Sequence, residues 1–145
     1  MDYYIDTCVW LNIFNVNEIN TKESKYSKEL IEKILFSKKH KILYSGFILK
    51  ELEFKLKKDY EKKKNWFKTE PNMIFIKATE KIYDSARKLE KENNYKISFF
   101  DYMHITLAKE TNSILITRDK DLLSTSKNLI IAQTPKIALE RIEFF

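Results

Sequence analysis

The chain alternates short apolar runs with long charged segments. The runs cover residues 2–6, 41–45, 73–77, 114–117 and 129–132. They are rich in Ile, Leu and Tyr, which is typical of short strands buried inside a sheet. The segments between them carry apolar residues at helical spacing among many Lys and Glu residues. The pattern therefore predicts strands that alternate with helices.

This alternation indicates an α/β fold, because parallel strands need a crossover connection that a helix usually supplies. We predict a three-layer α/β/α sandwich whose mostly parallel sheet has about five strands, covered by helices on both faces. The chain has 145 residues, enough for one sizeable core and too few for two ordinary domains. With one Gly and two Pro, it offers no flexible linker. Residues 1–145 are therefore expected to form a single domain.

Three carboxylates are placed to meet at one edge of this sheet. Asp6 ends the first apolar run, Glu51 is six residues past Ser45, and Asp119 is two residues past Thr117. In open α/β sheets, ligands bind beyond the carboxyl ends of the strands. The connectivity alone therefore brings these three acids to the edge where a ligand would bind.

A fourth carboxylate, Asp101, comes from a helix predicted over residues 99–110. Ser98 can cap this helix, so Asp101 lies in the first turn, where an acid often serves only the helix dipole. Ile105, one turn later, would place the carboxylate beside a buried aliphatic group, which is unfavourable unless a positive charge compensates. His104 lies on the same side of the helix. It either orients a carboxylate or is a satisfied, partly buried histidine.

Four clustered carboxylates imply a metal ion or protonation. Two carboxylates about 4 Å apart repel each other by roughly 4 kcal/mol at an effective dielectric constant of about 20. An all-oxygen set suits Mg²⁺ or Mn²⁺. Zinc is disfavoured, because His40 and His104 are far in sequence from Cys8, the one cysteine. Asp121 competes for the last acidic place, and we favour Asp119 because it is nearer the strand end.

Charge and composition indicate which binding partners and which cellular location the protein has. The chain has 27 basic and 21 acidic residues, a net charge of +6, which favours an acidic partner such as nucleic acid without demanding one. The pattern over Lys55–Lys68 predicts a long solvated helix, and its aromatic residues leave room for contact with a nucleic-acid backbone or for a protein interface. No apolar run is long enough to span a membrane, and no secretory signal is expected. The single Cys8 fits a reducing cytoplasm.

Four segments in this order are similar to a known family. YYIDTCVWLN at residues 3–12, GFILKEL at 46–52, FFDYMHITLAKE at 99–110 and ILITRDKDL at 114–122 together resemble the PIN domain. The resemblance is to its short VapC-type toxins of toxin–antitoxin pairs in particular. It covers nearly the whole chain and ends in the run around Pro135, which resembles the family's last strand and helix.

The resemblance implies a ribonuclease that cleaves single-stranded RNA with Mg²⁺ or Mn²⁺. The positions that match the family's four acids are Asp6, Glu51, Asp101 and Asp119, and Thr117 matches its hydroxyl residue before the last acid. Asp121 and His104 stand as possible supporting residues. Two alternatives remain open. One is a PIN nuclease of RNA processing outside any toxin pair. The other is a module that binds RNA or a partner without cutting, which predicts a disrupted acidic set.

The resemblance also implies protein partners: a cognate antitoxin and a second copy of the chain in a homodimer. Some apolar residues exceed the obvious needs of a small core and support this expectation. They are Tyr26, Leu30, Ile34, Trp66 and Phe67. Core packing explains the first three equally well. An antitoxin would insert a basic side chain among the acids, since a cation is what the cluster lacks without metal. No residue reveals the RNA target.

Overall fold

A single parallel sheet organises the molecule. The computed structural model describes residues 1–14 and 21–142. Within them, five parallel strands form a sheet in the order β3-β2-β1-β4-β5. The strands are β1 (Asp2–Ile5), β2 (Lys41–Ser45), β3 (Met73–Ile76), β4 (Ile114–Ile116) and β5 (Ala132–Gln133). Strand β1 lies at the centre, and the predicted α/β class is confirmed.

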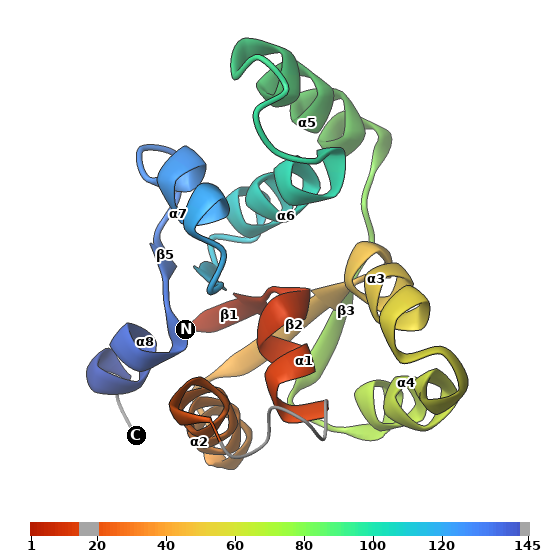
Figure 1. Ribbon diagram of the computed structural model, residues 1–145, viewed down its shortest axis with the longest axis vertical. Helices are drawn as coiled ribbons and strands as arrows, with labels where there is room; N and C mark the ends of the chain where they lie inside the picture. The colour runs from red at the N-terminus through yellow and green to blue at the C-terminus, as the bar shows by residue number, and fades with distance from the viewer. Residues whose placement is uncertain (15–20, 143–145) are drawn as a thin grey trace.

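Each connection between successive strands contains at least one helix, and helices lie on both sides of the sheet (Figure 1). The helices are α1 (Thr7–Phe14), α2 (Lys22–Phe36), α3 (Gly46–Leu56), α4 (Tyr60–Thr69), α5 (Glu80–Glu92), α6 (Phe99–Glu110), α7 (Lys120–Ser126) and α8 (Pro135–Arg141). Helices α5 and α6 pack together on one side, and α1, α2 and α8 lie on the other. This is the three-layer arrangement that the sequence predicts. The single domain over residues 1–145 stays a prediction.

The first four strands lie where their apolar runs predict, to within one residue, but the fifth begins later than predicted. The backbone N–H groups of Leu129 and Ile130 both donate to the carbonyl of Ser126, so these residues form a turn after α7. The ladder begins only where the carbonyl of Ile131 accepts the N–H of Leu115, at 3.0 Å. Apolar character alone therefore placed this strand too early.

The predicted long helix over Lys55–Lys68 is broken in two. Helix α3 ends at Leu56, and Lys57 has a positive φ of 52°. A 3₁₀ turn over Lys57–Asp59 follows before α4 begins. The break redirects the chain, and Phe67 of α4 is buried in the core at 1% exposure. The prediction was wrong because helical propensity along a charged run does not report such a change of direction.

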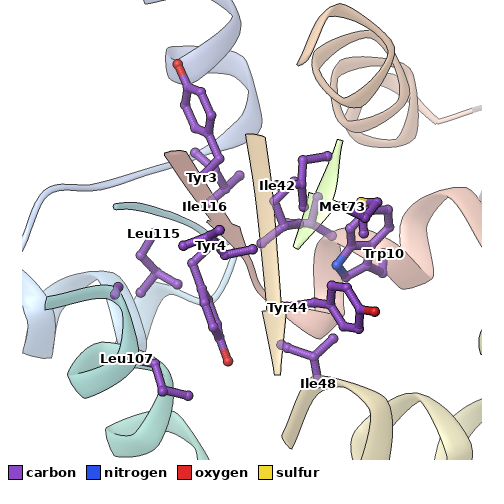
Figure 2. Packing of buried hydrophobic residues seen from close by; sticks show 14 of the residues in the cluster. Tyr3, Tyr4, Trp10, Ile42, Tyr44, Ile48, Met73, Leu107, Leu115 and Ile116 are labelled. Atoms are coloured by element: carbon purple, nitrogen blue, oxygen red, sulfur yellow. The ribbon is translucent and has the colours of Figure 1, made fainter. Parts of the chain in front are cut away.

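The core surrounds the central strands (Figure 2). Tyr4, Ile42 and Ile116 are fully buried on adjacent strands, and Trp10 of α1 packs against the same sheet. Tyr3 of β1 pairs in register with Ile42 of β2 and with Ile114 of β4. Because these strands are held in register, the residues that follow their carboxyl ends are held at one edge.

The residues that suggested a partner surface belong largely to this core. Leu30, Ile34 and Phe67 are at most 1% exposed. Trp66 is half-buried and lies edge-on to Trp10, with ring centroids 5.8 Å apart. These residues therefore offer no continuous exposed surface, and core packing accounts for them. Across the described residues, no helix combines the length and the apolar character needed to cross a bilayer.

Candidate active site

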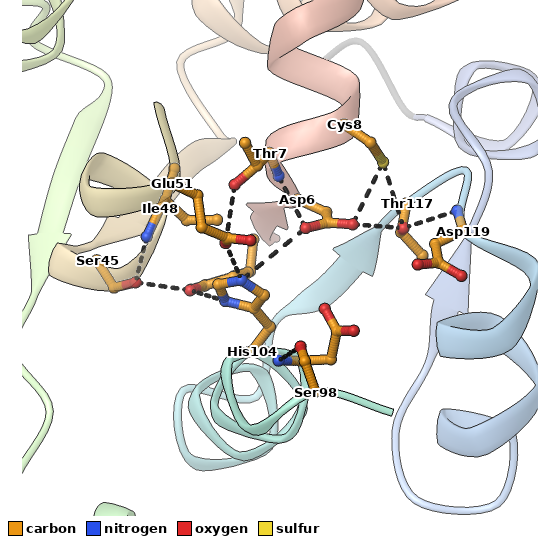
Figure 3. A network of polar contacts seen from close by, with 12 residues as sticks. Asp6, Thr7, Cys8, Ser45, Ile48, Glu51, Ser98, His104, Thr117 and Asp119 are labelled. Carbon is orange, nitrogen blue, oxygen red and sulfur yellow. Dashed lines mark hydrogen bonds and ion pairs between the residues drawn. The ribbon is translucent and has the colours of Figure 1, made fainter. Parts of the chain in front are cut away.

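Asp6 follows β1 directly and is held by three donors (Figure 3). Its Oδ1 accepts the backbone N–H of Thr7 at 2.8 Å. Its Oδ2 accepts the hydroxyl of Thr117 at 2.7 Å and faces the thiol of Cys8 at 3.2 Å. Asp6 is 5% exposed. Its carboxylate is therefore fixed in one orientation at the carboxyl edge of the sheet.

Glu51 reaches the same edge from α3. Ser45, the last residue of β2, caps α3 by accepting the N–H of Ile48 at 3.4 Å. One turn further on, Glu51 Oε1 accepts the hydroxyl of Thr7 at 3.0 Å and lies 2.7 Å from Nε2 of His104. The residue after Asp6 thus links the first two acids, as Figure 3 shows.

His104 of α6 is fully buried and bonded at both ring nitrogens. Its Nδ1 lies 2.7 Å from the hydroxyl of Tyr4, which in turn lies 2.7 Å from Oγ of Ser45. Its Nε2 donates to Glu51 and lies 3.9 Å from Oδ1 of Asp6. The Tyr4 hydroxyl can either donate or accept, so it satisfies both the neutral and the protonated imidazole.

The protonation of His104 reflects two opposing effects. Burial disfavours the charged imidazolium, but the hydrogen bond to Glu51 and the negative charges of Asp6, Glu51 and Asp101 outweigh it. The pKa of His104 is therefore raised above its usual value. The sequence offered two readings of this residue, one that orients a carboxylate and one that is satisfied and buried. The structure shows a satisfied histidine that is fully rather than partly buried, and one of its hydrogen bonds reaches the Glu51 carboxylate.

Asp101 lies in the first turn of α6, where the side chain of Ser98 accepts its backbone N–H at 3.2 Å. Burial and the charge of Asp6 raise the pKa of the half-buried Asp101 carboxyl to about 6, while the charge of His104 acts in the opposite direction. Asp101 therefore lies within electrostatic reach of both groups. When protonated, His104 supplies the positive charge that the sequence required beside this carboxylate.

Asp119 lies in the short segment between β4 and α7. It is exposed and caps α7, with Oδ1 accepting the N–H groups of Asp121 at 2.9 Å and Leu122 at 3.2 Å. Its own N–H donates to the hydroxyl of Thr117, the residue that bonds Asp6. Asp121 is also exposed. The structure thus joins Asp119 to Asp6 through Thr117, and the roles of the four acids as metal ligands stay a prediction.

Several residues of this site give no clear signal in the sequence. Tyr4 and Ser45 look like ordinary strand residues, yet they hold His104 in place. Thr7 could have been noticed only as a hydroxyl next to Asp6. Burial, together with the charge of Asp6, raises the pKa of the Cys8 thiol to about 12. A thiol with so high a pKa is largely protonated and therefore unreactive.

The donor set can be tested against a metal ion. One atom each of Asp6, Glu51 and His104 lie within 4.8 Å of one another. His104 has both nitrogens engaged, so binding a metal would break its bond to Glu51 or to Tyr4. The carboxylate oxygens of Asp6 and Glu51 remain. Burial and then the charge of Asp6 raise the pKa of Asp101, and a cation would relieve the second of these effects. Oxygen donors of this kind fit Mg²⁺ or Mn²⁺.

Comparison with known proteins identifies the family. The PIN domain model matches residues 3–128. The chain therefore belongs to the PIN domain family, as the four sequence segments predicted. A comparison with curated proteins gave no match.

Several solved structures share this fold. VapBC2 from Rickettsia felis, bound to a DNA fragment from its promoter, is 19% identical, with a TM-score of 0.64 over 92% of this chain and 98% of that chain. VapBC-1 from nontypeable Haemophilus influenzae is 16% identical, with a TM-score of 0.67 over 93% and 98%. VapC20 from Mycobacterium tuberculosis, described as a toxin that cleaves the sarcin–ricin loop, is 16% identical, with a TM-score of 0.66 over 84% and 93%. At these identities the likeness establishes the fold.

Proposed function

We propose that the chain is a divalent-metal-dependent endoribonuclease that cleaves single-stranded RNA, and that it is the toxin of a type II toxin–antitoxin pair. Membership of the PIN domain family supports a nuclease. The observation that carries the proposal is the convergence of Asp6, Glu51 and Asp101 around one buried histidine, although they come from three different parts of the chain.

The ligands proposed for Mg²⁺ or Mn²⁺ are Asp6, Glu51, Asp101 and Asp119. When bound, the ion supplies a water of lowered pKa and neutralises charge on the leaving oxygen of the phosphodiester. The chain's own residues prepare the site. Thr7 and Thr117 fix both oxygens of Asp6. His104 and Thr7 hold Oε1 of Glu51, which leaves Oε2 for other contacts.

The proposed partners and location follow from the same resemblance. The toxin–antitoxin origin of the similar structures supports an antitoxin, and we expect it to place a basic side chain among the acids in the absence of metal. A homodimer remains a proposal. Its support is now the edge strand β3, where Ile74 and Phe75 are 42% and 50% exposed. The lone Cys8 fits a reducing cytoplasm.

The test is cleavage of a labelled, unstructured RNA by the purified protein. We expect cleavage with Mg²⁺ or Mn²⁺, none in excess EDTA, and a loss of at least about a hundredfold in kcat for Asp6→Asn, since a metal ligand contributes several kcal/mol to the transition state. Asp84→Asn is the matched control, because Asp84 is an exposed acid of α5. Undiminished cleavage by folded Asp6→Asn protein would refute the proposal.

A further inference from the structure

A groove lies beside the acidic site and is lined by residues of α3 and by Phe100 in the first turn of α6. Its volume is about 420 Å³, and Thr7 and Glu51 of the candidate active site line one end. The rest of the lining is Lys50, Glu53, Phe54, Lys55 and Phe100. The groove is therefore continuous with the place where a phosphodiester would be cut.

Two phenylalanines give the groove its apolar surface. Phe54 is 77% exposed, and it makes no ring contact with any described residue. Phe100 is half-buried and lies edge-on to Phe47, with centroids 4.9 Å apart and an interplanar angle of 90°. One ring is thus held in place by its neighbour, while the other faces solvent. Flat apolar surfaces of this kind can stack an unpaired nucleobase.

The charges around the groove favour a polyanion over an apolar peptide. Glu53 lies 3.7 Å from Lys50, and Glu51 is bonded to Thr7 and His104, so both acids have partners. Lys55 is exposed and forms no ion pair with any described residue. The charge left without a partner at the rim is therefore positive, as the phosphates on either side of a stacked base require.

We propose that this groove binds one unpaired nucleobase of the RNA strand, stacked on Phe54 and Phe100, with Lys55 contacting a neighbouring phosphate. The inference rests on the proposed function, because it names the part of the substrate that the groove holds next to the cut. The stacked base lies beside the scissile phosphate, because Glu51 belongs both to the groove and to the acidic site. Recognition is then of single strands, since a paired base cannot leave its helix without unstacking.

The test compares Phe54 variants on one unstructured RNA oligonucleotide. KM and kcat are measured with Mn²⁺, and binding is measured by fluorescence anisotropy in EDTA. Phe54→Ala should weaken binding and raise KM about tenfold, the usual effect of losing one stacked base, with a smaller effect on kcat. Phe54→Trp should bind as the wild type does. Phe54→Leu, which stays apolar but cannot stack, should behave like Phe54→Ala.

The matched control is Phe36→Ala. Phe36 is 88% exposed at the end of α2, ahead of the amino end of β2, and its loss should leave binding unchanged. A series of oligonucleotides that each lack one base should show one position whose loss matches Phe54→Ala. When the oligonucleotide that lacks this base is tested with Phe54→Ala, binding should be no weaker than with either change alone. Wild-type RNA binding by Phe54→Leu, or fully additive effects, would overturn the proposal and assign the groove to an apolar protein segment. Binding in EDTA decides this even if the protein cuts no RNA.

Discussion

At the residue scale, the site depends on a chain of hydrogen bonds that begins at the first turn of α3 and returns to α3. Ser45 caps α3 and meets the Tyr4 hydroxyl, Tyr4 meets His104, and His104 meets Glu51, which lies on α3 itself. Strands β1 and β2 and helix α6 are tied to α3 in this way. A buried polar network of this kind is stable only while every member has its partner.

Tyr4→Phe tests this network. The change leaves the ring in the core but removes the hydroxyl shared by Ser45 and His104, so buried polar atoms lose a partner. The free energy of unfolding, measured by denaturant titration, should fall by about 1–3 kcal/mol. Tyr95→Phe is the control, since Tyr95 is 64% exposed, and it should change little. Equal stabilities of the two variants would show that the network does not stabilise the fold.

The raised pKa of Asp101 predicts a pH dependence. Folding raises the pKa of this carboxyl from its ordinary value of 3.8 to about 6. The protonated form is therefore favoured in the folded state, and the stability it gives is lost as the pH rises from about 4 to about 6. Without metal, Asp101→Asn should become more stable relative to the wild type over this range, by at most about 3 kcal/mol.

Denaturant titrations in EDTA at pH 4 and pH 7 measure this difference. Asp84→Asn, an exposed acid elsewhere, should track the wild type at both values. The raised pKa of His104 acts in the same direction but at higher pH, because its stabilising proton is lost only above the usual histidine range. A constant difference between Asp101→Asn and the wild type would contradict the assignment.

At the element scale, α7 allows the capping role of Asp119 to be tested apart from its proposed role as a metal ligand. Asp119 caps the helix through Oδ1, and Asn caps helices about as well as Asp. Asp119→Asn should therefore keep the stability and lose cleavage activity, whereas Asp119→Ala should lose activity and also about 1 kcal/mol of stability. Asp121→Asn, on the same helix, should reduce cleavage less. If Asp121→Asn reduced it more, Asp121 would be the fourth acid.

The sequence located correctly those strands and helices whose position depends on local apolar patterns. Four strands were located by their apolar runs. Strands β1, β2 and β4 are largely buried within the sheet, and the edge strand β3 is apolar along its length although Ile74 and Phe75 are exposed. The fifth was misplaced because turn hydrogen bonds to Ser126 hold Leu129 and Ile130 outside the ladder. The break at Lys57 occurs where the backbone takes a positive φ of 52°, which the pattern of charged residues does not record. Asp6 and Asp101 could be found from strand ends and caps, but Tyr4 could not, since its role depends on a contact with distant His104.

At the scale of the whole molecule, acids and bases are unevenly placed. The net charge is +6, yet Asp6, Glu51 and Asp101 converge within the fold around one histidine. Their mutual repulsion opposes folding without a cation, so a cation that binds only the folded chain should stabilise all of it. The proposed metal site therefore predicts that stability and metal affinity are coupled.

Mn²⁺ should raise the unfolding free energy of the wild type by about 2.7 kcal/mol at a concentration a hundred times its Kd. The gain should shrink at pH 5, because a proton on Asp101 competes with the metal. Thermal unfolding with and without Mn²⁺ at pH 5 and pH 7.5 measures both effects. Asp6→Asn should gain little at either pH, whereas Asp84→Asn should gain as much as the wild type. An equal gain for Asp6→Asn would place the metal elsewhere on the molecule.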